Sequence, residues 1–110
     1  MRNYNEEPLF SILIASYNRP KYLKKCIKSI IDSDFSDFEI IISDDCSPNQ
    51  DKIQEVVESF NNINIKLYLQ KKNLREPRNK NFLVSKANGK FNINIGDDDL
   101  LHPKSLLIIK

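Results

Sequence analysis

Three consecutive carboxylates, Asp97, Asp98 and Asp99, follow the alternating apolar segment Phe91-Asn92-Ile93-Asn94-Ile95-Gly96. The alternation predicts a β-strand over 91–95, so the acids lie at its C-terminal end, where open α/β sheets bind ligands. Three adjacent negative charges repel one another unless a cation joins them, and oxygen ligands suit Mg²⁺ or Mn²⁺. The triplet predicts a divalent-metal site for an anionic ligand, first of all a phosphate compound. Taken alone, it leaves a solvated acidic turn equally open.

Other residues with useful chemistry also follow predicted strands. Tyr17 can stack on a planar ring, and a carboxylate of the Asp44-Asp45 pair can accept a hydrogen bond from a ring N–H. Arg75 and Arg78 fall between the third and fourth predicted strands, where a guanidinium can clamp phosphate oxygens. Together these features predict a pocket for a nucleoside diphosphate, with an aromatic ring, an acid, a basic clamp and a metal site.

The elements that must position these residues alternate along the chain. Hydrophobic patterning predicts strands over 9–16, 38–43, 63–69 and 91–95. It predicts helices over 20–31, 48–60 and 77–87 and a fourth from Pro103, with Ser47 as the N-cap of the second and Gly89 ending the third. This β-α-β order predicts an α/β, Rossmann-like fold whose mostly parallel sheet has helices on both faces. The carboxyl ends of the strands then meet at one rim.

Composition narrows the class of protein. The 110 residues are 40% hydrophobic and 29% charged, which is typical of one soluble globular domain over 1–110. The net charge of +2 does not by itself indicate nucleic acid or a membrane. The row Lys21, Lys24, Lys25 and Lys28 is interpreted as solvated helix surface. Cys26 is expected in the core; with Cys46 as its only companion, no zinc site or disulfide scaffold is expected.

The ends of the chain carry two further expectations. The N-terminus lacks the apolar stretch of a signal peptide, and no segment approaches transmembrane length. We therefore expect a cytoplasmic protein, or a peripheral one at the cytoplasmic face of the membrane. The chain stops within the apolar stretch Leu106–Ile109, which suggests a fragment of a longer enzyme. If exposed, that stretch would favour self-association.

Four segments resemble those of family 2 glycosyltransferases in order and spacing. They are FSILIASYNRP over 10–20, IIISDDCS over 40–47, PRN over 77–79 and GKFNINIGDDDLLHP over 89–103. The resemblance implies a GT-A fold and a nucleotide-sugar donor. It implies that Ala15 and Tyr17 line the base pocket and that Asp45 binds the base edge, with Asp44 beside it.

The same resemblance assigns the phosphate and metal groups. Arg75 or Arg78 would lie toward the diphosphate, and Asp97 would face the ribose. The triplet takes the place of the family's DxD motif, so Asp98 would be the first metal ligand, with Asp99 in its place or beside it. The chain departs from the family at Gly96, where many members carry an acid. The loop before 77–79 is also shorter than in the family.

The implied reaction is a metal-dependent, inverting transfer from a nucleotide sugar, first of all a UDP-sugar, to an acceptor hydroxyl. The expected acceptor is a saccharide or lipid-linked sugar of cell-surface polysaccharide biosynthesis, and no nucleic-acid partner is expected. In the family, the acceptor half and general base follow the DxD motif, so we expect the 110-residue chain alone to be inactive. Two alternatives are a non-catalytic nucleotide-binding remnant and, less favoured, a receiver-like Mg²⁺-binding signalling module.

Overall fold

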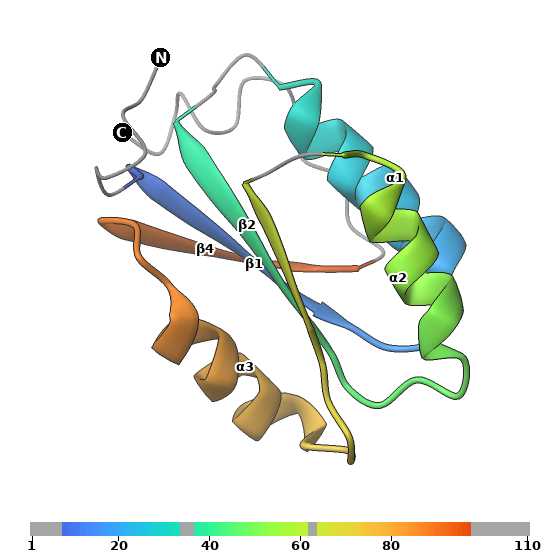
Figure 1. Cartoon of the computed structure of the whole chain (residues 1–110). Coiled ribbons are helices and arrows are strands. Elements are labelled where there is room, and N and C mark those ends of the chain that lie inside the picture. The colour runs from blue at the N-terminus through green and yellow to red at the C-terminus, as the bar shows by residue number, and fades with distance from the viewer. Residues whose placement is uncertain (1–7, 34–36, 62–63, 98–110) are drawn as a thin grey trace.

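A parallel four-stranded sheet organises the chain in the computed structural model, which describes residues 8–33, 37–61 and 64–97 (Figure 1). The strands are β1 (Phe10–Ser16), β2 (Phe38–Asp44), β3 (Ile65–Leu69) and β4 (Phe91–Gly96). Their order is β3-β2-β1-β4, and every neighbouring pair is parallel. The predicted parallel α/β sheet is confirmed. The expected helix from Pro103 and the apolar stretch 106–109 lie outside the described residues.

The helices cover both faces of the sheet, as predicted. α1 (Pro20–Ile31) and α2 (Gln50–Glu58) lie on one face, and α3 (Arg75–Lys86) lies on the other (Figure 1). Returning from β3 to β4 past the two central strands requires the chain to cross to the opposite face, because crossover connections are right-handed. None of these three described helices has the length and apolarity needed to cross a bilayer.

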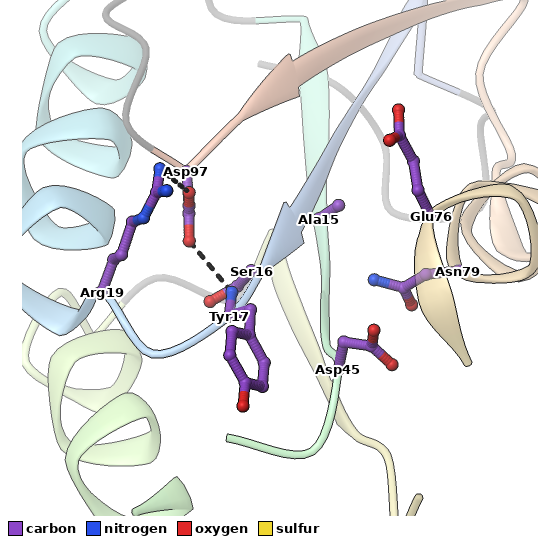
Figure 2. A pocket seen from close by; sticks show the side chains of 8 residues that line it. All are labelled: Ala15, Ser16, Tyr17, Arg19, Asp45, Glu76, Asn79 and Asp97. Atoms are coloured by element: carbon purple, nitrogen blue, oxygen red, sulfur yellow. Dashed lines mark hydrogen bonds and ion pairs between the residues drawn. The ribbon is translucent and has the colours of Figure 1, made fainter. Parts of the chain in front are cut away.

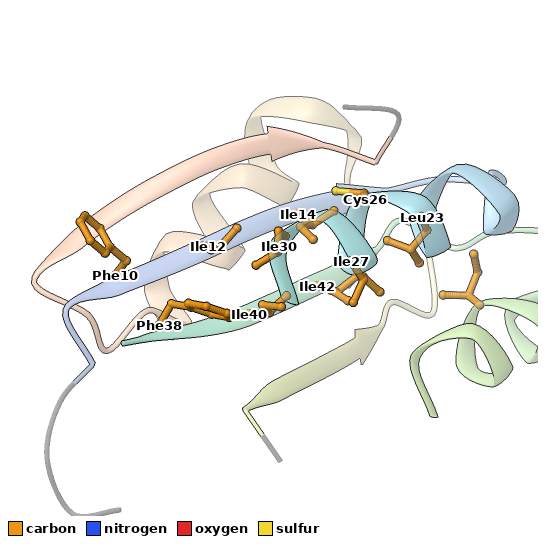
Figure 3. Close-up of a cluster of buried hydrophobic side chains, with 11 residues drawn as sticks. Phe10, Ile12, Ile14, Leu23, Cys26, Ile27, Ile30, Phe38, Ile40 and Ile42 are labelled. Carbon is orange, nitrogen blue, oxygen red and sulfur yellow. The ribbon is translucent and has the colours of Figure 1, made fainter. Parts of the chain in front are cut away.

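The core follows from the period-two alternation of strand side chains. Ile12, Ile14 and Ile40 point toward α1 and α2 and are fully buried (Figure 3). The alternate residues Leu13 and Ile41 point the other way and pack on Leu83 of α3. The central strands β1 and β2 are therefore buried on both faces, which explains why they read as nearly continuous apolar runs. Cys26 lies in the first cluster, as expected.

The starts of two helices differ from the sequence prediction. α2 begins at Gln50 with Asn49 as its N-cap, so Ser47 is not the cap. The hydroxyl of Ser47 instead donates to Asp44 Oδ1 at 2.6 Å, because the buried carboxylate lies within reach of the tight turn after β2. α3 begins at Arg75, two residues before the predicted start at Pro77, because Asp45 accepts hydrogen bonds from its first backbone N–H groups.

The sequence prediction that Gly89 ends α3, as a helix C-terminal glycine does, is wrong. α3 ends at Lys86, and no described glycine has positive φ. The glycine is required for a different reason, because a Cβ at position 89 would lie 2.6 Å from the backbone nitrogen of Ser11. Gly89 N–H also donates to Ser11 Oγ at 2.7 Å, and that hydroxyl donates to buried Glu39 at 2.6 Å. Close backbone approach therefore fixes where β4 begins.

We expect Gly89→Ala to lower the free energy of unfolding by about 1–3 kcal/mol, the usual cost of overpacking. The added methyl group would meet β1 backbone, which cannot rotate away as a flexible side chain can. Urea unfolding followed by circular dichroism measures the change. The neighbouring exposed Lys90→Ala is the control and should stay within about 0.5 kcal/mol of the unsubstituted chain. Equal midpoints for the two variants would contradict the close approach.

Candidate functional site

The carboxyl ends of β1, β2 and β4 and the first turn of α3 surround a hollow of about 270 Å³ (Figure 2). Its lining residues are Ala15, Ser16, Tyr17, Arg19, Asp45, Glu76, Asn79 and Asp97. An adjoining hollow of about 330 Å³ shares Tyr17, Asp45 and Glu76 and adds Asn73 and Arg75. Segments that are far apart in the sequence thus converge at the rim where ligands of parallel sheets bind.

Asp97 joins the end of β4 to the turn that follows β1. Its carboxylate is nearly buried; Oδ2 accepts a hydrogen bond from Tyr17 N–H at 3.0 Å, and Arg19 Nη1 lies 3.7 Å from Oδ1 (Figure 2). β1 and β4 are paired neighbours, so this short side chain reaches the turn directly. The first acid of the triplet therefore sets the position of the backbone at Tyr17.

Asp45 joins the end of β2 to the start of α3. This half-buried carboxylate accepts hydrogen bonds from Leu74 N–H at 2.5 Å and Arg75 N–H at 3.1 Å. An acid at this end of a helix satisfies orphan backbone donors and complements the helix dipole. Each carboxylate oxygen has a second acceptor position, so Asp45 can still accept from a ligand.

Asp44 lies beside Asp45 but turns into the protein and is fully buried. It accepts hydrogen bonds from Ser47 N–H at 2.9 Å and Ser47 Oγ at 2.6 Å. It also accepts from Gln50 Nε2 at 3.1 Å and Ser16 Oγ at 3.4 Å. Asp44 does not line the hollow; it holds the loop after β2 in place.

Two contacts fix the rest of the rim. Ser47 Oγ accepts a hydrogen bond from Asn18 N–H at 2.7 Å, which ties the β1–α1 turn to the loop after β2. On the other side, buried Asn79 donates to the Ser43 carbonyl at 3.2 Å and accepts from Ser43 Oγ at 2.5 Å. The amide of Asn79 thereby holds the first turns of α3 against β2, next to the hollow.

The lining is predominantly acidic. Among the described residues that line the first hollow, three are acidic (Asp45, Glu76 and Asp97) and one is basic, Arg19. The second hollow adds one basic residue, Arg75. The hydrogen bond from Lys80, and then its charge, lowers the pKa of Glu76, so this exposed carboxylate is ionised at neutral pH. An anionic ligand here needs additional positive charge, and the metal expected from the sequence stays a prediction. Within 8–33, 37–61 and 64–97, however, no three acidic, histidine or cysteine side chains form a metal-binding group.

The structure thus brings together most of the residues predicted for the ligand site. Ala15, Tyr17, Asp45, Arg75 and Asp97 line the two hollows. Arg78 is exposed on α3 and lines neither hollow, while Asp98 and Asp99 lie outside the described residues.

Sequence reasoning missed Ser16, Arg19 and Glu76, and it assigned no role to Asn79. The position of Arg19 two residues after Tyr17, in a turn at the predicted rim, was the one available signal for it.

Cys46, in the loop after Asp45, has a left-handed backbone with φ 62°. A side chain in this conformation costs about 1–2 kcal/mol, which glycine avoids. We expect Cys46→Gly to raise the free energy of unfolding by about 0.5–1 kcal/mol, because greater freedom of the unfolded chain offsets part of the gain. Thermal unfolding measures this. Cys46→Ala keeps the Cβ and should show no gain, so a gain of equal size in both variants would contradict the explanation.

This fold and rim define a GT-A-type α/β unit, and the comparisons with known proteins agree. The family model of Glycosyl transferase family 2 matches residues 11–109, so the chain belongs to this family. A Campylobacter jejuni protein named GalNAc(5)-diNAcBac-PP-undecaprenol β-1,3-glucosyltransferase is 38% identical over 97 residues, 86% of this chain and 31% of that protein. The chain spans well under half of the length of such curated relatives, from 14% to 38%.

Solved structures show the same fold. Staphylococcus aureus TarS in complex with UDP-GlcNAc has a TM-score of 0.82 at 29% identity, covering 91% of this chain and 29% of that one. A mannosyltransferase from Pyrobaculum calidifontis, at 15% identity, has a TM-score of 0.80 over 93% of this chain and 31% of its own. The receiver-like alternative has no support, because β1 leads into Tyr17 rather than an acid pair and β3 leads into Gln70.

Proposed function

We propose that this chain binds the nucleotide-sugar donor of a glycosyltransferase that builds cell-surface polysaccharide. A UDP-sugar is the first candidate for this donor. The observation that carries the proposal is the convergence of Tyr17, Asp45 and Asp97 on one hollow from the ends of three neighbouring strands. A related structure, that of TarS, was solved with UDP-GlcNAc, and the Campylobacter relative is named as a glucosyltransferase.

Five of the lining residues have a role in this proposal. The ring of Tyr17, 47% exposed, stacks on the base, and the free acceptor position of Asp45 takes a base N–H. The small side chain of Ala15 lets the base approach β1. Asp97 accepts from a ribose hydroxyl beside its hydrogen bond to Tyr17 N–H. Arg75 lines the second hollow and pairs with the diphosphate.

The same proposal includes a divalent metal. Asp98 is the first choice of metal ligand, and Asp99 serves instead of Asp98 or together with it. The three acids lining the first hollow would repel a diphosphate, which supports a cation in this part of the site. Mg²⁺ or Mn²⁺, when bound, neutralises charge on the departing nucleoside diphosphate. Asp97, fixed by Tyr17 N–H, positions the chain that leads to these two acids.

The chain's share of the reaction is to bind and orient the donor. In an inverting transfer, a carboxylate deprotonates the acceptor hydroxyl, and we assign this base to none of the described residues. The acceptor is a saccharide or a lipid-linked sugar at the cytoplasmic face of the membrane. We expect no transferase activity from the 110-residue chain, so turnover of UDP-GlcNAc by this chain alone would contradict the proposal that its share of the reaction is limited to donor binding.

Calorimetric titration of UDP with and without Mn²⁺ tests the proposal. We expect binding that requires the metal and that weakens at least about tenfold in Asp98→Ala, because a metal–phosphate bridge contributes more than an ordinary hydrogen bond. Asp51→Ala, which removes an exposed acid of α2, is the control and should bind as the unsubstituted chain does.

Two results would count against this assignment. If neither UDP nor GDP binds under any metal condition, the donor-binding function is wrong. If UDP binding needs the metal but Asp98→Ala is unaffected, Asp98 is not the ligand, and Asp99→Ala becomes the test. Donor binding without sugar transfer, measured on any longer protein that contains this chain, would favour the non-catalytic remnant.

A further inference from the structure

All exposed side chains of α1 are basic or aromatic. They are Lys21, Tyr22, Lys24, Lys25 and Lys28. The four lysines follow i, i+3, i+4, i+7 spacing, so they form one stripe along the helix. The buried residues of α1, among them Leu23 and Ile27, point toward the sheet on the opposite side (Figure 3). The stripe, which we call the α1 lysine face, therefore points away from the protein.

The α1 lysine face is electrostatically unfavourable for the helix that carries it. The four lysines make four like-charge pairs at i, i+3 or i, i+4, which repel. The first turn of this fully described helix has no acid, and Lys21 lies at the end where the helix dipole disfavours cations. Within the described part of the chain, only Lys28 of the four has an acidic partner, Asp32 at 2.5 Å. An external anionic surface would remove this repulsion.

We infer that the α1 lysine face binds an anionic membrane, through the phosphates of acidic phospholipid headgroups. Clustered lysines on an amphipathic helix have the complementary charge and spacing for such a surface. Tyr22, 55% exposed, flanks the stripe and can place its amphipathic ring at headgroup level. A single-stranded nucleic acid is a less suitable partner, because proteins bind it in a groove that carries several aromatic rings for base stacking. The exposed face of α1 is convex and carries one aromatic ring, that of Tyr22.

The neighbouring helix determines how the membrane would be approached. α2 packs beside α1, and its exposed side chains include three acids, Asp51, Glu55 and Glu58, against one lysine, Lys52. An anionic surface attracts α1 and repels α2, so the molecule would tilt onto its α1 side.

This orientation has a consequence for the hollow at the rim of the sheet. α1 begins at Pro20, directly after the turn that contains Tyr17 and Arg19, so its N-terminal end adjoins the rim hollow. Membrane contact along α1 would hold the rim near the headgroups, where a lipid-linked acceptor presents its sugar. That consequence rests on the proposed function, whereas the membrane contact itself does not require donor binding.

Vesicle flotation of the full 110-residue chain tests the inference. Vesicles of phosphatidylcholine with about one third phosphatidylglycerol should bind the chain, and pure phosphatidylcholine should not, since attraction requires surface charge. A variant with Lys21, Lys24, Lys25 and Lys28 all replaced by Gln should bind on the order of a hundredfold or more weakly, at about fivefold per lysine. The control replaces four exposed lysines outside α1, which are Lys52, Lys71, Lys72 and Lys90.

Equal loss of vesicle binding in both quadruple variants, or no binding of the unsubstituted chain to anionic vesicles, would overturn the inference. So would a single-stranded oligonucleotide that binds through the α1 lysine face more tightly than the vesicles do, because it would identify a different partner. UDP titration of the α1 variant separates this inference from the proposed function. We expect unchanged UDP affinity, since none of the four lysines lines the hollows.

Discussion

Replacing Asp44 by alanine is expected to lower the free energy of unfolding by about 3–5 kcal/mol, the largest loss we expect from a rim residue, because several buried donors lose their acceptor. The carboxylate is fully buried and accepts hydrogen bonds from Ser16, Ser47 and Gln50. Alanine would remove this acceptor from the Ser16 hydroxyl and from the hydroxyl and N–H of Ser47, and each unsatisfied buried group costs about 1–3 kcal/mol. Gln50 would keep its other hydrogen bond, to the Gln70 carbonyl at 2.8 Å. The loop after β2 would then lose its anchor, including the Ser47 hydroxyl that receives Asn18 N–H.

Urea unfolding measures this loss, and Asp45→Ala is the matched control. Asp45 is the adjacent acid but is half-buried and accepts two hydrogen bonds from the start of α3, so its loss should cost about 1 kcal/mol, as for a helix cap. Asp44→Asn should be intermediate, because it keeps the shape but turns one acceptor into a donor that faces other donors. Similar losses for Asp44→Ala and Asp45→Ala would contradict the division between a fully buried anchor, Asp44, and a half-buried residue proposed to bind the ligand, Asp45.

The strands and the topology could be predicted from the sequence because period-two alternation and buried apolar runs determine which face each residue occupies. The central strands carried the strongest signal, since Ile40, Ile41 and Ile42 are buried on both faces. Helix ends were less predictable. Ser47 was a reasonable N-cap by residue type, but the buried Asp44 beside it offered its hydroxyl a stronger, charged acceptor. A contact between segments 78 residues apart made Gly89 necessary, and no local rule describes such a contact.

The site was predictable as far as strand ends determine it. Tyr17, Asp45 and Asp97 each follow a strand, and parallel neighbours bring their ends together. Asp44 is buried and Asp45 lines the hollow because successive side chains of a strand point in opposite directions, and this alternation continues at the end of β2. By contrast, Arg19 and Glu76 reach the hollow through a turn with a left-handed residue, Asn18, and through the early start of α3, neither of which the sequence pattern specifies.

Tyr17→Ala is expected to weaken UDP binding about 10–100-fold while leaving the stability of the fold nearly unchanged. Stacking of a base on an aromatic ring contributes about 1–3 kcal/mol, which corresponds to this range of affinity. The ring is 47% exposed and lines both rim hollows. The hydrogen bond that Tyr17 donates to Asp97 comes from its backbone N–H, so alanine keeps it. Truncation therefore removes the stacking surface and leaves the turn in place.

Calorimetry with UDP and Mn²⁺, alongside urea unfolding of each variant, measures the two effects separately. Tyr17→Phe keeps the ring and should bind nearly as the unsubstituted chain does, which would assign the effect to stacking rather than to the hydroxyl. Tyr22→Ala removes a tyrosine of comparable exposure that lines neither hollow, so it should not change UDP affinity. If Tyr17→Ala binds UDP within about twofold of Tyr22→Ala, a difference too small for a lost stacking contact, the base does not lie on Tyr17. The rim hollow would then need a different ligand orientation, with the base placed away from β1.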